Sequence, residues 1–307
     1  MAGLIGGDCK TVKIISGSKP GGTTDTLARD LATSLMTSKV VGTAIVENKT
    51  GAAGQLAAST IATSGKCDVY MANAAPLSIN QFTKKAPAPE SIMTPVGMVA
   101  KYPNLFTVGK SLAGAKDFAA VVEMSKKAPL RYGTSGVGSI NHLAMEKLKE
   151  ETGLVADHIP YNGSNEAALA LAAGTIDIVF DGAAPLMPLY EKYGFRMVGA
   201  STGETADTSV VIDGKTIRVP ALVYKGKTFA AHSWIGLVGS KANANAAVVK
   251  DMNAALNQML TDPAMKAKYE GGLGINLTPS TPEALGKYMQ TQAVDWQSFA
   301  LAHGKDQ

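Results

Sequence analysis

The sequence has no long hydrophobic run, no clustered charge of one sign and only two cysteines. No segment approaches the run of about 18 apolar residues that a membrane-spanning helix needs, so we expect no direct membrane insertion. The 29 Lys and Arg residues are scattered, and only Lys84-Lys85 and Lys126-Lys127 are adjacent pairs. Nucleic acid would require a basic stripe with interleaved aromatic residues, and only 6% of the residues are aromatic. We therefore expect no nucleic-acid partner.

The first residues lack the charged n-region and the apolar h-region of a signal peptide. Residues 1–7 resemble a processed or re-engineered end, so a secreted origin has to be argued from other features. The net charge of +4 is compatible with a small anionic ligand but does not establish one.

Motifs for metals and cofactors are missing as well. His142, His158, His232 and His303 are far apart and have no Cys or carboxylate neighbours at the spacing of metal ligands. We expect neither a metal ion nor a cofactor.

Short apolar runs alternate with helical patterns from one end of the chain to the other. This alternation is typical of parallel sheets covered by helices on both faces. After the first run, for instance, Leu27, Leu31 and Leu35 share one face of a helix. The expected strands are 12–15, 43–47, 68–73, 96–100, 105–108, 130–133, 158–161, 176–180 and 234–238, and the expected helices include 55–63, 140–151, 165–173, 243–260, 263–269 and 282–302.

Two successive series of strands and helices, followed by a return strand, predict two doubly wound α/β lobes joined by a hinge with two crossings. The strands 96–100 and 105–108 are almost in line and are broken at Tyr102-Pro103, where the chain would cross between lobes. The first lobe is expected to contain residues 1–101 and 231–307, and the second residues 102–230.

Two loops share one design and are the main candidates for a binding site. Each follows a strand, is rich in glycine and opens a helix, whose unpaired N–H groups and dipole favour an anion. In an open α/β sheet, ligands bind at the carboxyl ends of the strands, where both loops fall. Each loop on its own could equally be a tight turn. The candidate ligand-binding residues are Lys19, Pro20, Gly21, Gly22, Thr23 and Asp25 in the first loop, and Thr134, Ser135, Gly136, Val137, Gly138 and Ser139 in the second.

Three enzymatic motifs fail at these loops on individual residues. A P-loop needs Lys directly after Gly22, where Thr23 stands. A dinucleotide-binding fingerprint that starts at Gly136 needs glycine at Asn141. A nucleophile elbow around Ser135 needs glycine at Val137.

Further candidates stand near strand ends. Asp181 could contact a ligand or cap the next helix, and Tyr161 stands at a similar junction. Asn73 and Asn80 flank the start of a helix, where capping and binding both remain open. Tyr161, Phe180 and Trp234 could supply an apolar wall for a longer or aromatic acid.

Six segments in a fixed order cover nearly the whole chain and resemble a known family. They are Pro-Gly-Gly-Thr-Thr-Asp at 20–25, and the segments 46–54, 132–139, 159–164, 173–181 and 233–238. Their order resembles the periplasmic solute receptors of tripartite tricarboxylate transporters, often called the Bug family.

The resemblance implies a class II periplasmic-binding-protein (Venus flytrap) fold, in which the two glycine-rich loops grip a ligand carboxylate, partly through water. It further implies a periplasmic monomer that delivers a small mono- or dicarboxylate to the membrane subunits of a secondary transporter. The sequence departs from the family at Ser18-Lys19, where an apolar pair is usual, so the usual ligands cannot be carried over. The segment 210–227 is also unlike the usual connection and contains a hairpin-like stretch, 211–219.

Two alternatives belong to other functional classes. An enzyme of the same architecture acting on an anionic substrate would need a base or nucleophile, for which Asp25, Asp181 and His142 are the candidates. The effector lobe of a transcription regulator would need a helix-turn-helix before the first strand, and only eleven residues precede Val12. We expect a receptor and not an enzyme.

The two cysteines are expected to form a disulfide. Cys9 and Cys67 each lie just before a predicted strand, and the first and third strands of a doubly wound sheet are commonly parallel neighbours. Their starts would then lie about 5 Å apart, which suits the Cα separation of about 5.5–6 Å in a disulfide. Two free thiols are the alternative. A disulfide would support an oxidising compartment.

Overall fold

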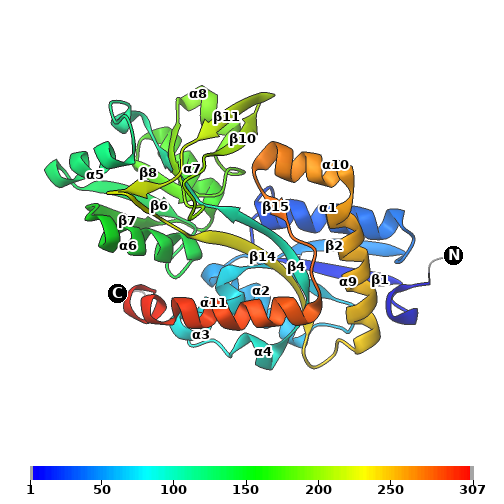
Figure 1. Ribbon diagram of the computed structural model, residues 1–307. Helices are drawn as coiled ribbons and strands as arrows, with labels where there is room; N and C mark the ends of the chain where they lie inside the picture. The colour runs from blue at the N-terminus through cyan, green and yellow to red at the C-terminus, as the bar shows by residue number, and fades with distance from the viewer. Residues whose placement is uncertain (1–2, 305–307) are drawn as a thin grey trace. The chain divides into compact units, whose positions relative to one another are not determined.

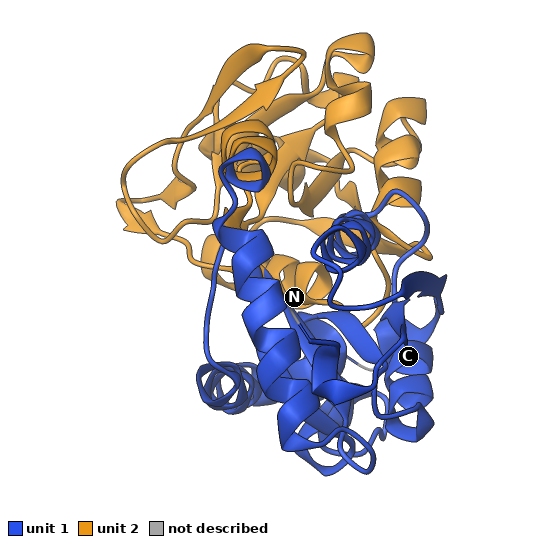
Figure 2. Cartoon of the chain, turned by 90° about the vertical axis from the view of Figure 1, so that its right-hand side faces the viewer, with its two compact units in different colours: residues 1–100, 234–266, 277–305 blue, residues 101–233, 267–276, 306–307 orange. Residues whose placement is uncertain are grey.

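The structure is a computed structural model that describes residues 3–304. The described chain divides into two compact units, which Figure 2 shows in different colours. Unit 1 consists of residues 3–100, 234–266 and 277–304, and unit 2 of residues 101–233 and 267–276. The chain passes from unit 1 to unit 2 within strand β4 (Met93–Pro103) and returns within β14 (His232–Ser240).

Unit 1 is built on a six-stranded sheet with the order β15-β4-β14-β3-β1-β2. Strand β1 (Thr11–Ser16) pairs in parallel with both β2 (Thr43–Asn48) and β3 (Val69–Asn73), whereas β14 runs antiparallel to β3. The expected Leu27, Leu31 and Leu35 stripe on α1 is fully buried. The remaining elements are α1 (Thr23–Thr37), α2 (Gln55–Thr63), α3 (Asn80–Thr83), α4 (Pro89–Ile92), α9 (Ala246–Thr261), α10 (Pro263–Lys266), α11 (Pro282–His303) and the edge strand β15 (Asn276–Leu277) (Figure 1).

Unit 2 is built on a five-stranded sheet with the order β7-β6-β8-β5-β9. Strand β6 is parallel to β7 and β8, while β5 is antiparallel to β8 and β9. Phe106, Tyr132 and Phe180 are among its largest fully buried side chains. The elements are β5 (Leu105–Val108), β6 (Leu130–Thr134), β7 (Ala156–Pro160), β8 (Ile178–Asp181), β9 (Arg196–Ala200), α5 (Phe118–Lys127), α6 (Ile140–Thr152), α7 (Ser164–Ala173) and α8 (Tyr190–Tyr193).

The hairpin expected near 211–219 is confirmed, as strands β10 (Thr208–Ile212) and β11 (Lys215–Val219). Its turn has positive φ at Asp213 and Gly214, and Asp-Gly is a favoured pair for such two-residue hairpin turns. Val210, Ile212 and Val219 join the hydrophobic core of unit 2. A second short hairpin follows, β12 (Val223–Tyr224) with β13 (Lys227–Thr228).

Two sequence expectations about the chain's path need correction. The break expected at Tyr102-Pro103 is wrong, because β4 continues through Pro103 and only Asn104 separates it from β5. Residues 267–276, expected in the first lobe, lie in unit 2. Gly274 packs there against β10, so closely that a Cβ atom on it would stand 3.1 Å from Val210 Cγ1. Residues 1–2 and 305–307, which the expected first lobe includes, lie outside the described residues.

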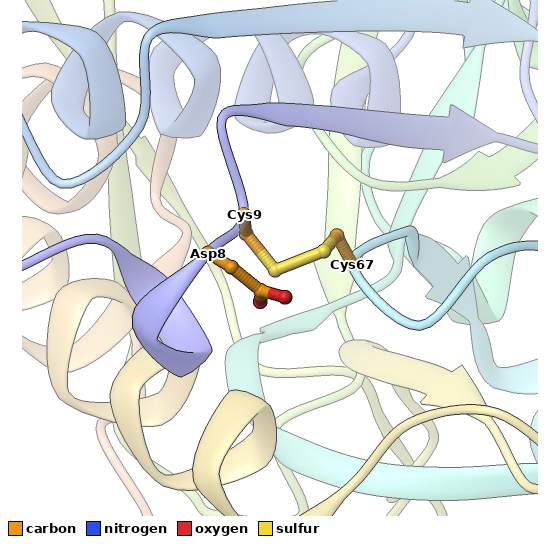
Figure 3. A group of neighbouring side chains, drawn as sticks. All are labelled: Asp8, Cys9 and Cys67. Atoms are coloured by element: carbon orange, nitrogen blue, oxygen red, sulfur yellow. A yellow bond between two sulfur atoms is a disulfide. The ribbon is translucent and has the colours of Figure 1, made fainter.

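The structure joins Cys9 and Cys67 in a disulfide with a Cα–Cα distance of 5.8 Å. The bridge links the segments that lead into the parallel neighbours β1 and β3 (Figure 3). Asp8 lies beside it and forms an ion pair with Lys66 at 2.6 Å. Because both sulfurs are bonded to each other, this group offers no thiolate to a metal ion.

None of the described helices has both the length and the apolar content to span a bilayer.

Candidate ligand-binding site

The first glycine-rich loop connects β1 to α1. Gly21 has a φ of +83°, a conformation that favours glycine, and Gly22 stands at the N-cap of α1. Since Gly22 has no side chain, the N-terminal amides of α1 receive no hydrogen bond from the N-cap residue. Lys19 and Pro20 lie on the exposed part of this loop, while Thr23 is partly buried. The N-terminus of α1 is thus an uncapped, electropositive helix end.

Asp25 braces the first loop from inside. One carboxylate oxygen accepts from the Gly21 amide at 2.9 Å and from Arg29 Nε at 3.0 Å. The other accepts from Arg29 Nη2 at 3.0 Å and from Asn48 Nδ2 at 2.8 Å. Asn48 Nδ2 also donates to the carbonyl of Ser18 at 2.8 Å, so β2 is tied to the same loop.

The environment keeps Asp25 ionised. Burial by itself would raise the pKa of Asp25, but hydrogen bonds from Arg29, Asn48 and the Gly21 amide outweigh burial and lower this pKa below its ordinary value. A carboxylate with both oxygens engaged in this way holds the loop in shape. Direct contact between Asp25 and a ligand stays a prediction.

Residues 51–54 of unit 1 form a strained segment that was not predicted as a binding site from the sequence. Gly51, Ala52, Ala53 and Gly54 all have positive φ, an unusual conformation for the two alanines. Tyr70 Oη donates to the Gly54 carbonyl at 3.1 Å, which fixes this segment against β3. The signal in the sequence was the pattern Gly-Ala-Ala-Gly after a strand, which looks like an ordinary turn.

Asn80 lies close to this segment and Asn73 is the last residue of β3, and both side chains are incompletely paired. Asn80 Nδ2 donates to the Ala53 carbonyl and to Gln55 Oε1, both at 3.2 Å. The Oδ1 atoms of Asn73 and Asn80 are buried and have no hydrogen-bond partner. Unpaired buried acceptors are rare and costly, so both residues remain candidate donors or acceptors for a ligand.

The second glycine-rich loop connects β6 to α6. Gly136 and Gly138 have φ values of +128° and +77°, and Ser139 caps α6 by accepting from the His142 amide at 3.3 Å. Thr134 Oγ1 accepts from the Gly136 amide at 3.2 Å. Ser135, Gly136 and Val137 form the partly exposed tip of the loop.

Two histidines support this loop from below. His142 Nδ1 accepts from the Gly138 amide at 3.1 Å, and the His142 ring is stacked on His158 with centroids 4.0 Å apart. His158 Nε2 lies 2.7 Å from Thr134 Oγ1 and shares a hydrogen bond with it. Burial lowers the pKa of His158 to about 3, with a smaller contribution from the charge of His142, so His158 is neutral at ordinary pH. From the sequence alone, His142 and His158 were expected to lie apart from each other.

Asp181 is the last residue of β8 and is buried in unit 2. One carboxylate oxygen accepts from the Gly182 amide at 2.7 Å, while Oδ2 is buried and has no hydrogen-bond partner. Burial raises the pKa of Asp181 to about 6, although Ser164, the Gly182 amide and Asn141 oppose the rise. A buried, half-paired carboxyl at a strand end is typical of a functional position.

The aromatic candidates Tyr161 and Phe180 differ in their surroundings. Tyr161 is partly exposed, and its amide donates to the Thr134 carbonyl at 3.1 Å, next to the second loop. Phe180 is fully buried and packs between Phe106 and Phe229, with ring centroids 5.9 and 6.2 Å away. Phe180 therefore belongs to the core of unit 2, and we leave it out of the proposed site.

Solved structures share this architecture. A structure of R. palustris Rpa4515 with adipate is 22% identical, covers 96% of this chain and 98% of that chain, and gives a TM-score of 0.85. The periplasmic binding protein BugD is 23% identical over 96% of this chain and 99% of that chain, with a TM-score of 0.82. MatC (Rpa3494) from Rhodopseudomonas palustris with bound malate is 20% identical over 94% and 98%, with a TM-score of 0.80. The predicted two-lobed α/β fold of periplasmic binding proteins is confirmed.

The sequence of the chain matches a protein family as well. Residues 27–299 match the family described as tripartite tricarboxylate transporter family receptor. The match begins within α1, after the first glycine-rich loop, and it includes the second loop, the return strand β14 and most of α11. This chain therefore belongs to the family of tripartite tricarboxylate transporter receptors, as the order of its motifs indicates.

Proposed function

We propose that this protein is a periplasmic receptor that captures a small mono- or dicarboxylate for the membrane subunits of a tripartite tricarboxylate-type transporter. The observation that carries the proposal is the pair of glycine-rich loops, one in each unit, that each open a helix at the end of a sheet strand. The adipate and malate bound by two structurally similar proteins support a carboxylate as ligand.

The proposed contacts come from both loops and from the half-paired groups near them. Main-chain amides and hydroxyls donate to the carboxylate, and the exposed Lys19 adds positive charge at the first loop. The proposed ligand-binding residues are Lys19, Pro20, Gly21, Gly22, Thr23, Asp25, Asn73, Asn80, Thr134, Ser135, Gly136, Val137, Gly138, Ser139, Tyr161 and Asp181.

Such a set of contacts can supply the affinity that a receptor needs. A micromolar dissociation constant corresponds to about −8 kcal/mol. Hydrogen bonds to a charged group contribute about 1.5–3 kcal/mol each, so a few of them supply most of this free energy before ordering costs.

A receptor is favoured over an enzyme by the state of two of the three candidate catalytic groups, Asp25 and His142. Both oxygens of Asp25 are engaged by the loop, and His142 Nδ1 already accepts from the Gly138 amide. We propose that the chain binds its ligand without changing it. Prolonged incubation with a bound acid, followed by NMR of the acid, checks this, because the appearance of a product would contradict it.

The periplasmic location rests on the family and on the disulfide. Disulfides persist in oxidising compartments such as the periplasm, and Cys9 and Cys67 are bonded. We propose a monomer, and light scattering with and without ligand measures its mass against the 31.7 kDa of one chain.

A thermal-shift screen tests the proposed ligand class. Small mono- and dicarboxylates, including adipate and malate, are compared with sugars, polyamines and the uncharged diamide of adipate. A ligand at 100 times its dissociation constant stabilises the folded state by about 2.7 kcal/mol, which is a shift of several degrees. We expect at least one acid to stabilise the protein and the diamide not to. Stabilisation by sugars or polyamines alone would contradict the proposal.

A further inference from the structure

The second loop is held in shape by its two glycine amides, and both depend on the histidines below. The Gly138 amide donates directly to His142 Nδ1 at 3.1 Å. The Gly136 amide donates to Thr134 Oγ1 at 3.2 Å, and that hydroxyl lies 2.7 Å from His158 Nε2. The stacked imidazoles of His142 and His158, with centroids 4.0 Å apart, therefore underlie the hydrogen-bond frame of the loop.

The bond from the Gly138 amide requires a neutral His142 ring. An imidazole nitrogen accepts a hydrogen bond only when it carries no proton. The neutral ring with its proton on Nε2 can serve as this acceptor, whereas the imidazolium ion has an N–H on both nitrogens. In the charged state two donors, His142 Nδ1–H and the Gly138 N–H, would face each other at 3.1 Å.

We propose that His142 is the positioning residue of the second loop, and that the loop binds its carboxylate only while this imidazole is neutral, so that acidification weakens binding. This inference rests on the proposed function. His142 need not touch the ligand, because it acts through the amide of Gly138 and the conformation of the loop.

The charged and titratable groups that face His142 lie on α6, β6 and β7. Glu146, one turn further along α6, favours the imidazolium, and Lys149 bonds to Glu146 at 2.8 Å and opposes this effect. Tyr132, on β6, stacks on the far side of His158 and donates to Glu146 at 2.5 Å. His158 faces His142 directly from β7 and stays neutral, since burial lowers its pKa to about 3. Histidine is the side chain that ordinarily titrates between pH 5 and 8.

The conservative variant His142→Asn keeps a hydrogen-bond acceptor for the Gly138 amide but removes the titratable ring. The amide oxygen of Asn can stand near the position of Nδ1 and accept from Gly138, but it does not titrate. His142→Leu removes the acceptor at every pH. His303→Asn, on α11 of unit 1, controls for the loss of a titrating histidine far along the chain from the loop.

Affinity for an acid found in the screen is measured by calorimetry from pH 7.5 to 5.5 for each variant. Between pH 7.5 and 5.5 we expect the affinity of the wild type and of His303→Asn to fall by about tenfold or more beyond any fall that His142→Asn shows. His142→Leu should be weak at both pH values, and His142→Asn should recover most of the lost affinity. Protonation of the acid itself is common to all variants and cancels in the comparison.

A parallel pH dependence in wild type and His142→Asn would overturn the inference. So would a larger gain of affinity in the wild type at low pH, because the added positive charge would then outweigh the loss of the loop's frame.

The ligand-free protein provides a readout that does not depend on the proposed function. In ¹⁵N NMR spectra we expect the Gly138 amide and the His142 ring nitrogens to titrate together in the wild type, and the Gly138 amide to stay still in His142→Asn. A Gly138 amide that does not respond while His142 titrates would refute the positioning role. If no carboxylate binds at any pH but the NMR titration is as expected, the proposed function fails and the positioning role stands.

Discussion

Replacing Asp181 by Asn should stabilise the protein at neutral pH and change its affinity for the carboxylate ligand. The carboxyl is buried, its Oδ2 has no hydrogen-bond partner, and burial raises its pKa to about 6. An ordinary Asp has a pKa of 3.8, so at neutral pH the buried site disfavours the charged form by about 3 kcal/mol. Asn keeps an oxygen for the Gly182 amide and carries no charge.

The pH dependence has a definite sign. Between pH 3.8 and about 6 the folded state holds a proton on Asp181 that the unfolded state has lost, so stability falls as pH rises through this window. Below this window the wild type and Asp181→Asn should be similarly stable. Above it the variant should be more stable, by up to about 3 kcal/mol.

Urea unfolding of both proteins at pH 4 and at pH 7 measures this difference. Asp68→Asn is a control in the first unit. Its two carboxylate oxygens accept from the Lys13 amide at 3.2 Å and from the Gly65 amide at 3.1 Å, so an amide NH₂ in place of one oxygen should destabilise instead. A variant Asp181→Asn that is less stable than the wild type at pH 7 would refute the reasoning, because the hydrogen bonds of the carboxylate would then outweigh the cost of its burial. Unchanged affinity for the acid would refute the role of Asp181 in binding.

Three further predictions concern the bridge and the first loop. The disulfide closes a loop of 58 positions, so the double variant Cys9→Ser/Cys67→Ser should have a free energy of unfolding about 4 kcal/mol lower than the wild type, measured by urea unfolding. Equal stability of the two proteins would show that the bridge does not stabilise the fold. Asn48→Ala removes the bonds to Ser18 and Asp25, both 2.8 Å, and should weaken acid binding severalfold in calorimetry, whereas Asn243→Ala, a matched exposed bond to Ser64, should not. Arg29→Met removes the main cation from Asp25, so the pKa of Asp25 measured by NMR should rise from its lowered value; an unmoved pKa would show that Asn48 and the Gly21 amide suffice.

Local sequence patterns were enough to predict most strands of the two sheets and the two glycine-rich loops, but not β9 or the antiparallel pairs that β5 and β14 form. The stripe of Leu27, Leu31 and Leu35 and the apolar strand runs are local signals, and tertiary packing agrees with them. The disulfide followed from strand neighbours in a doubly wound sheet, which Cys9 and Cys67 precede. These features depend on few residues at short range.

Features that depend on distant contacts could not be predicted in the same way. Residues 267–276 lie in unit 2, where Gly274 packs against Val210, and no local sequence pattern predicts this contact. His142 and His158 lie in different elements, so their stacking requires the fold. Asp25 stands in the first loop, where a ligand contact was predicted. Its carboxylate accepts a hydrogen bond from Asn48, which lies far along the chain, so this structural role could not be predicted from the sequence.

The most direct test of the central claim is calorimetry with the best acid of the screen, at pH 7.5, on the wild type, Gly138→Val and Gly153→Val. Both glycines have positive φ, +77° and +72°, so the two variants carry similar backbone strain. Gly153 is at the far end of α6 with open space around it. We expect the wild type and Gly153→Val to bind with similar, roughly micromolar dissociation constants. Gly138→Val should bind at least tens of fold more weakly, because the valine side chain blocks the approach of the carboxylate to the loop. Equal affinity of all three proteins would contradict the claim that this loop holds the carboxylate.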